Sequence, residues 1–193
     1  MTKIEEGRKY EKIALDCLRQ NNLTEAESNF LQALKHMKQS GDETGQAYVL
    51  GNLGNLCFQS RRLDKAEEYY GKALTYMEKV NDVKGIESSL GNLGSVLFYK
   101  GNLDEAEEIY KKALKLLEEA SDSQGQSIYN ENLGNVHLKK DDLGAAEDYF
   151  NRAKTLLDSE KHKDRIKQVE DKLVALKKHP KYVEGKEKDL LSE

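Results

Sequence analysis

Apolar residues recur along the chain with the spacing of amphipathic helices. In one stretch Leu63, Ala66, Tyr70, Ala73 and Leu74 follow one another at steps of three, four, three and one. These steps place all five side chains on one face of an α-helix, because residues three and four positions apart lie above one another. Charged residues fill most of the positions between them, so the pattern predicts a helix that buries a single stripe.

The same pattern returns every 40 residues, which indicates internal repeats. A leucine–glycine pair marks one position of the repeat, and an aromatic residue follows each glycine sixteen positions later. The recurring positions are Leu53, Leu93 and Leu133; Gly54, Gly94 and Gly134; Ala26, Ala66, Ala106 and Ala146; and Phe30, Tyr70, Tyr110 and Phe150. One repeat cannot bury its own apolar stripe, so we expect the repeats to stack into a continuous core.

Each repeat is predicted to contain two helices. The first helix of a repeat is expected to begin after Asp42, Asp82 or Asp122, because an aspartate side chain caps free backbone N–H groups. The second is expected to begin at a capping box, in which a Thr or Asp pairs with a glutamate three positions later. The boxes are Thr24 with Glu27, Asp64 with Glu67, and Asp104 with Glu107.

The repeat glycines lie inside predicted helices, where glycine costs about 1 kcal/mol relative to alanine. A recurring cost of this kind needs a steric reason. We expect the paired helix to approach closely at Gly54, Gly94 and Gly134, with the small side chains of the repeat alanines on the facing side. The aromatic residue of each repeat is then expected to wedge between repeats.

These elements predict an all-α protein with a single domain over residues 1–179. The repeats are placed at about 3–40, 43–80, 83–120 and 123–159. A further amphipathic helix at 163–178 is expected to cover the apolar edge of the last repeat. The charged residues 180–193, which begin at the only proline of the chain, are expected to form a flexible tail.

Composition excludes several function classes. The net charge of −4 provides no basic surface for nucleic acid. No apolar run approaches the roughly 20 residues of a membrane span, and two lone cysteines favour a reducing compartment. We therefore expect a cytoplasmic protein that binds neither nucleic acid nor membrane. The four histidines lack metal-ligand spacing, so neither a metal, a cofactor nor an enzymatic activity is predicted.

The repeat positions resemble the tetratricopeptide repeat, which has a Leu-Gly pair followed by Ala, an aromatic residue and Ala at set offsets. The 40-residue spacing and the string GNLG are similar to the Leu-Gly-Asn-rich Pins family and to kinesin light chains. The resemblance implies an α-solenoid of helical hairpins, a right-handed superhelix with a C-terminal capping helix, and a concave groove that binds peptides.

The resemblance also implies which side chains face the groove, since the family places them next to the Leu-Gly pair. The candidate peptide-binding residues are Asn52, Asn55, Asn92, Ser95, Tyr99, Asn132, Asn135, Lys139 and Lys12. An asparagine carboxamide both donates and accepts hydrogen bonds, so it can pair with an extended peptide backbone. The same side chains can instead bond to one another and tie adjacent helices together, and both interpretations stay open.

Three functions are compatible with this sequence. The first is a protein-interaction scaffold, or adaptor, that binds a peptide segment of a partner protein. The second is a structural protein that self-associates into a homo-oligomer through the ends of the solenoid. The third is a regulatory subunit that responds to a peptide and acts through a second protein. The sequence does not name the partner.

Overall fold

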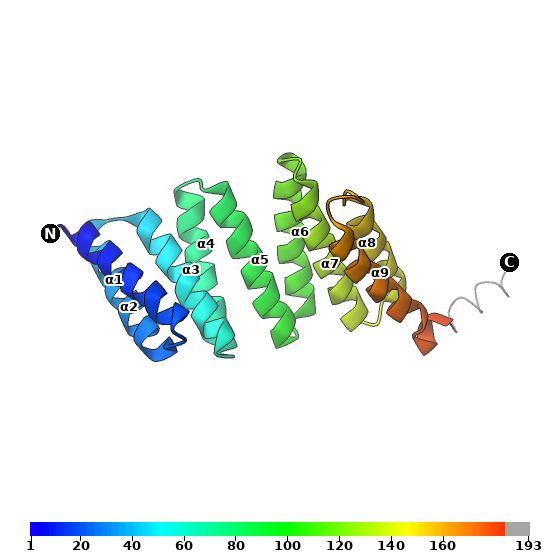
Figure 1. Cartoon of the computed structure of the whole chain (residues 1–193), viewed down its shortest axis with the longest axis horizontal. Coiled ribbons are helices and arrows are strands. Elements are labelled where there is room, and N and C mark those ends of the chain that lie inside the picture. Colours follow the sequence, from blue (N-terminus) through cyan, green and yellow to red (C-terminus); the bar gives the residue numbers. More distant parts are fainter. Residues whose placement is uncertain (184–193) are drawn as a thin grey trace. The chain divides into compact units, whose positions relative to one another are not determined.

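The computed structural model describes residues 1–183, and these residues form helices and no strands. The helices follow one another along the chain (Figure 1). They are α1 Lys3–Arg19, α2 Leu23–Ser40, α3 Glu43–Gln59, α4 Leu63–Lys79, α5 Val83–Lys100, α6 Leu103–Glu119, α7 Ser123–Lys139, α8 Leu143–Thr155 and α9 Lys163–Lys177. The all-α prediction is confirmed.

The chain forms two compact units, Met1–Asn102 and Leu103–Glu193. The first contains α1 to α5 and the second contains α6 to α9. Each unit has its own buried core, so each is described by itself. The single domain over residues 1–179 stays a prediction.

The first helix of each repeat after the first begins where an aspartate caps it, as predicted. The side chains of Asp42, Asp82 and Asp122 accept hydrogen bonds from the backbone N–H groups of Gly45, Gly85 and Gly125 at 2.8, 3.0 and 2.9 Å. The glycine at this position has a steric cause. A Cβ atom on Gly45 would lie 2.8 Å from Sδ of Met37 in the preceding helix.

The predicted capping boxes of the second helices are wrong, because these helices begin earlier. In α2 the N-cap is Asn22, whose side chain accepts from the N–H of Glu25 at 3.3 Å. The preceding residue, Asn21, has a positive φ of 58° and ends α1 in a left-handed turn. Only Asn22 then lies between this turn and the first residue of α2, so Asn22 must serve as the cap. The same holds for Arg62, which offers no capping side chain.

The glutamate of each predicted box has a different role, since it bonds to the following repeat. Glu27 receives two hydrogen bonds from Arg62, both at 2.9 Å. We call each such contact a repeat tie. The four ties are Glu27–Arg62, Glu67–Lys100 at 2.7 Å, Glu107–Lys140 at 2.6 Å and Glu147–Tyr182 at 2.6 Å. The first three join neighbouring repeats at one recurring position, and the fourth joins the last repeat to the residues that follow α9.

All three repeat glycines are buried, and at Gly54 and Gly134 a neighbouring residue approaches closely, as expected. The neighbour, however, is the aromatic residue of the same repeat rather than the alanine. A Cβ atom on Gly54 would lie 2.6 Å from the Tyr70 ring, and one on Gly134 would lie 2.6 Å from the Phe150 ring. Tyr70 also packs with Val96 of the next repeat, so the ring does lie between repeats.

The last helix, α9, covers the final repeat. Val169, Leu173 and Leu176 are buried against Phe150 and Ala153 of α8. This helix was predicted at 163–178. The first residues of the predicted tail, 180–183, form a helical turn, and the partly buried Tyr182 packs against the same core and donates to Glu147. Residues 184–193 lie outside the described part of the chain.

Candidate functional site

The structure brings three of the predicted site residues together in the first unit. Asn52 and Asn55 of α3 and Asn92 of α5 line a groove of about 230 Å³. Lys84 and Ser88 add polar side chains to its lining, which also includes Tyr48, Gly51, Tyr70 and Met77. We call this the α3/α5 groove. Because equivalent positions of neighbouring repeats face the same groove, the repeat itself generates the site.

The asparagines of this groove differ in their bonding. Asn55 accepts a hydrogen bond from the phenol of Tyr70 at 2.6 Å. Burial, which is the main cause, raises the pKa of Tyr70, so this phenol keeps its proton and stays a donor. Asn52 and Asn92 hydrogen-bond to no other described residue. Asn55 therefore ties two helices together, whereas Asn52 and Asn92 keep free carboxamides.

The other predicted residues of the first unit do not line this groove. Lys12 is exposed on α1, and the hydroxyl of Ser95 donates to the carbonyl of Gly91 at 2.8 Å. Tyr99 lies at the end of α5 and is 54% exposed. Its ring contacts Phe58 and Phe98, with ring centroids 5.5 and 5.7 Å apart. It therefore belongs to an aromatic cluster at the end of the helix.

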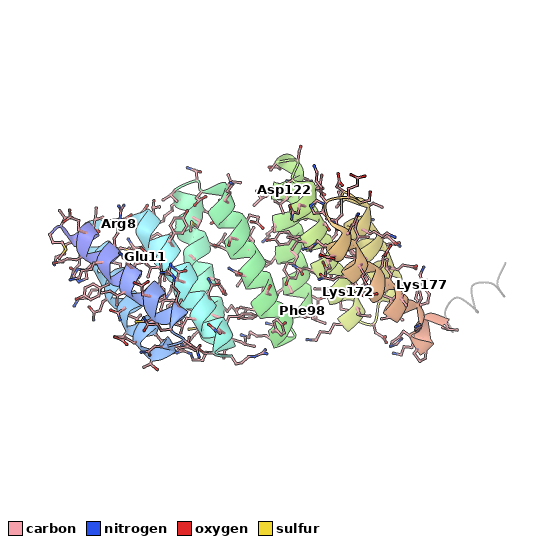
Figure 2. All side chains as sticks on the ribbon, in the orientation of Figure 1. Arg8, Glu11, Phe98, Asp122, Lys172 and Lys177 are labelled. Atoms are coloured by element: carbon pink, nitrogen blue, oxygen red, sulfur yellow. The ribbon has the colours of Figure 1, made fainter. Side chains whose placement is uncertain are left out.

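In the second unit a capping helix supplies the groove partner. Lys172 of α9 stands in the register of Asn52, Asn92 and Asn132, and it reaches Asn135 at 3.1 Å and Glu131 at 2.7 Å. Arg165 bonds to the same Glu131 at 2.8 Å. Figure 2 labels Lys172 on α9. Ion pairs therefore occupy this position, while the corresponding α3/α5 groove is uncharged apart from Lys84.

The remaining predicted residues of α7 lie close by. Asn132 is half-buried and hydrogen-bonds to no other described residue. Lys139 lies near the end of the helix, where it is exposed to solvent but interacts with other side chains. The ion pairs of Glu131 with Arg165 and Lys172 were not predicted from the sequence. They depend on Glu131, and the equivalent positions of the two preceding repeats hold Gly51 and Gly91.

A second hollow of about 250 Å³ adjoins the α3/α5 groove at Tyr48. Arg8 and Glu11 of α1, which are labelled in Figure 2, line it together with Asp42 and Thr44. Burial raises the pKa of Glu11, although Arg8 opposes the shift. These residues were missed as candidates. The repeat register would have indicated them, because Arg8 and Glu11 precede Tyr48 and Gly51 by one repeat.

Tyr48 is fixed at the rim of both hollows. Its hydroxyl donates to Asp82 at 2.7 Å, and this bond raises the pKa of Tyr48 and lowers the pKa of Asp82. Asp82 also caps α5 through the N–H of Gly85. The tyrosine ring is half exposed, so it presents an apolar face beside Asn52.

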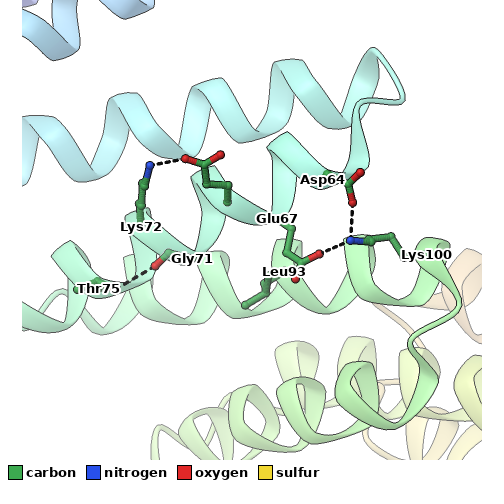
Figure 3. A pocket seen from close by; sticks show the side chains of 8 residues that line it. Asp64, Glu67, Gly71, Lys72, Thr75, Leu93 and Lys100 are labelled. Atoms are coloured by element: carbon green, nitrogen blue, oxygen red, sulfur yellow. Dashed lines mark hydrogen bonds and ion pairs between the residues drawn. The ribbon is translucent and has the colours of Figure 1, made fainter.

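A larger hollow of about 600 Å³ between α4 and α5 has paired polar groups (Figure 3). Lys100 bridges Asp64 at 2.6 Å and Glu67 at 2.7 Å. Lys72 pairs with Glu68, and Thr75 donates to the carbonyl of Gly71 at 3.1 Å. Its charges satisfy one another, so we assign it no ligand.

The described residues offer little for catalysis or metal binding. No group of three or more His, Cys, Asp and Glu side chains within residues 1–183 is placed to hold a metal ion. Cys17 and Cys57 are buried free thiols whose pKa values burial raises, which makes them poor nucleophiles. No helix in this part of the chain has the length and apolar character needed to cross a membrane.

Comparison with known families identifies the repeat. The family model described as "Tetratricopeptide repeat" matches residues 5–79 and 85–159. Comparison with curated proteins finds none that matches this chain.

Solved structures share the fold. BtubC (BKLC) from P. vanneervenii is 25% identical with a TM-score of 0.72, and the match covers 78% of this chain and 62% of that protein. The apo form of RapI is 16% identical with a TM-score of 0.81 over 89% and 63% of the chains. A signal transduction ATPase with a tetratricopeptide repeat sensor from Pyrococcus horikoshii is 15% identical with a TM-score of 0.80 over 88% and 26%. The chain thus spans less than two thirds of each of these proteins.

Proposed function

Because the chain belongs to the tetratricopeptide repeat family, we propose that it is a non-catalytic scaffold that binds an extended segment of a partner protein in the α3/α5 groove. A protein-interaction scaffold is what the fold implies, and the groove is the specific part of the proposal. It is supported by the free carboxamides of Asn52 and Asn92, which stand at one register in adjacent repeats.

The chemistry of the groove favours a peptide backbone over a charged ligand. Each free carboxamide offers two donor hydrogens and one acceptor oxygen, which match the alternating C=O and N–H groups of an extended chain. Lys84 is the one charged residue among those lining the groove. Neutral segments or segments with a single acidic residue therefore fit better than strongly charged ones. Tyr48 supplies an apolar face for one side chain of the segment.

The test is a double substitution of the free carboxamides, Asn52→Ala with Asn92→Ala. Partners retained by the immobilised wild-type chain are identified by mass spectrometry, and the main partner is then titrated. The variant is expected to bind it about tenfold more weakly or worse, which corresponds to about 1.4 kcal/mol. Circular dichroism establishes that the variant is folded.

Asn151→Ala serves as the matched control, because Asn151 is an exposed asparagine of α8 that does not line the groove. It should leave binding unchanged. If the double variant retains the same partner with the same affinity, the α3/α5 groove is not the binding site.

Three more specific expectations from the sequence are part of this proposal. They are the kinship with the Leu-Gly-Asn-rich Pins family and kinesin light chains, the cytoplasmic location, and the lack of nucleic-acid binding. Self-association and a peptide-responsive regulatory role stay predictions, and light scattering of the purified chain tests the first of them.

A further inference from the structure

A separate groove, on another part of the first unit than the α3/α5 groove, lies between α2 and α4, the second helices of the first two repeats. It has a volume of about 390 Å³, and its lining includes Leu31, Leu34, Leu50, Tyr69 and Tyr76. Leu34 and Leu50 are buried at its base, whereas Leu31 is 44% exposed. A further hollow of about 430 Å³ continues along α2 past Leu31 and Leu34 to Lys35 and Lys38. We call these two hollows together the α2/α4 surface.

The leucine that forms this surface is peculiar to the first repeat. The positions equivalent to Leu31 are Gly71, Lys111 and Asn151. Stability of the repeat therefore does not require an apolar residue there. Leu31 extends the apolar lining of Leu34, Leu50, Tyr69 and Tyr76 to the surface, and contiguous exposed apolar patches mark interaction sites.

The charges of the α2/α4 surface are unbalanced. Lys35 and Lys38 pair with no described residue, whereas Lys72 pairs with Glu68 on the opposite side. The residues equivalent to Lys38 are Glu78, Glu118 and Asp158, so this position is basic in the first repeat and acidic in the others. The free cations attract an acidic partner.

We propose that the α2/α4 surface docks an amphipathic helix of a partner protein whose polar face is acidic. Leu31, Leu34 and Lys38 follow the three-and-four spacing of one helical face, and a ridge of this kind packs into the groove between side-chain ridges of another helix. Leucines of the partner helix contact Leu31 and Tyr76, and its carboxylates pair with Lys35 and Lys38.

The test uses a fluorescent synthetic peptide of about five helical turns, with leucines on one face and glutamates on the other. One comparison peptide has the same composition in scrambled order, and another has every glutamate replaced by lysine. Binding to the full chain is measured by fluorescence anisotropy at two salt concentrations. The ordered acidic peptide is expected to bind, more weakly at high salt, while both comparison peptides fail.

Two variants locate the binding. Leu31→Ser, and Lys35→Glu with Lys38→Glu, should each weaken it by about tenfold or more. The controls are Leu138→Ser, which removes another exposed leucine, and Lys115→Glu, which reverses an exposed lysine at the register of Lys35. Both should leave the affinity unchanged, and so should Asn52→Ala with Asn92→Ala, because those residues line the other groove.

The proposal is overturned if the scrambled or lysine peptide binds equally well, or if the Leu31 and lysine variants bind like the wild type. Vesicles of phosphatidylcholine with phosphatidylserine provide the remaining arm. Sedimentation with these vesicles that depends on Lys35 and Lys38, without binding of the acidic peptide, would show a lipid surface and overturn the protein partner.

Discussion

At the scale of single residues, the neighbouring atoms decide whether a glycine can be replaced by a larger residue. Gly51 and Gly54 both lie inside α3, three positions apart. A Cβ atom on Gly54 would meet the Tyr70 ring at 2.6 Å, whereas one on Gly51 would have nothing within 4 Å. The same residue type is therefore required at one position and replaceable at the other.

This difference predicts opposite effects of the same substitution. Gly54→Ala should lower the free energy of unfolding by about 1–3 kcal/mol, because overpacking against the ring outweighs the gain in helix propensity. Gly51→Ala should raise it by up to about 1 kcal/mol, since only the propensity changes. Urea unfolding followed by circular dichroism measures both. Equal stabilisation by the two substitutions would contradict the close approach of Tyr70.

At the scale of helices, the repeat ties show how charged residues join neighbouring repeats. Burial alone would raise the pKa of Glu107, but hydrogen bonds from Lys111 and Lys140 lower it to about 2. An unfolded glutamate has a pKa of about 4.3. Since the folded pKa is the lower one, this tie stabilises the fold above about pH 4.3 and loses its contribution as the pH falls toward 2.

Lys140→Gln tests the tie through its pH dependence. The variant should be less stable than the wild type at pH 7, and the difference should narrow as the pH falls from about 5 toward 2. Urea unfolding at a series of pH values measures this. Lys115→Gln, which removes an exposed lysine of α6 outside the ties, should show no such dependence. A difference that stays constant with pH would mean that Glu107 is not held ionised by Lys140.

The capping helix α9 allows a similar comparison of two apolar residues. Leu176 is 2% exposed against the core of the last repeat, whereas Val174 is 51% exposed on the same helix. Leu176→Ala should therefore lower the free energy of unfolding by about 2–5 kcal/mol. Val174→Ala should change it by less than about 0.5 kcal/mol. If both variants unfold like the wild type, α9 does not cover the repeat core.

At the scale of the whole molecule, the sequence specified local features better than contacts between elements. The caps Asp42, Asp82 and Asp122 were predictable because an aspartate cap acts within one turn. The starts of the second helices were not, because a left-handed turn at residues such as Asn21 and Arg61 carries no glycine signal. The helix interior fixed the repeat register, and that register decided the fold.

The candidate site was predictable to the same extent. Asn52, Asn55 and Asn92 lie together because equivalent positions of stacked repeats face one groove. The bond from Tyr70 to Asn55 and the reach of Lys172 to Glu131 were not predictable, since each depends on where a long side chain of another helix ends. The ligand role of these residues stays a prediction.

The placement of the ties bears on how such a chain can lengthen. Glu67 and Lys100 both fall within residues 63–102, and Glu107 and Lys140 both fall within 103–142. A segment made of one repeat's second helix and the next repeat's first helix therefore contains both residues of one repeat tie. A tandem duplication of such a segment would add a glutamate and its lysine partner together. A duplication of one helical hairpin, in contrast, would separate the two residues of each pair, so the new repeat would depend on its neighbours for the partner.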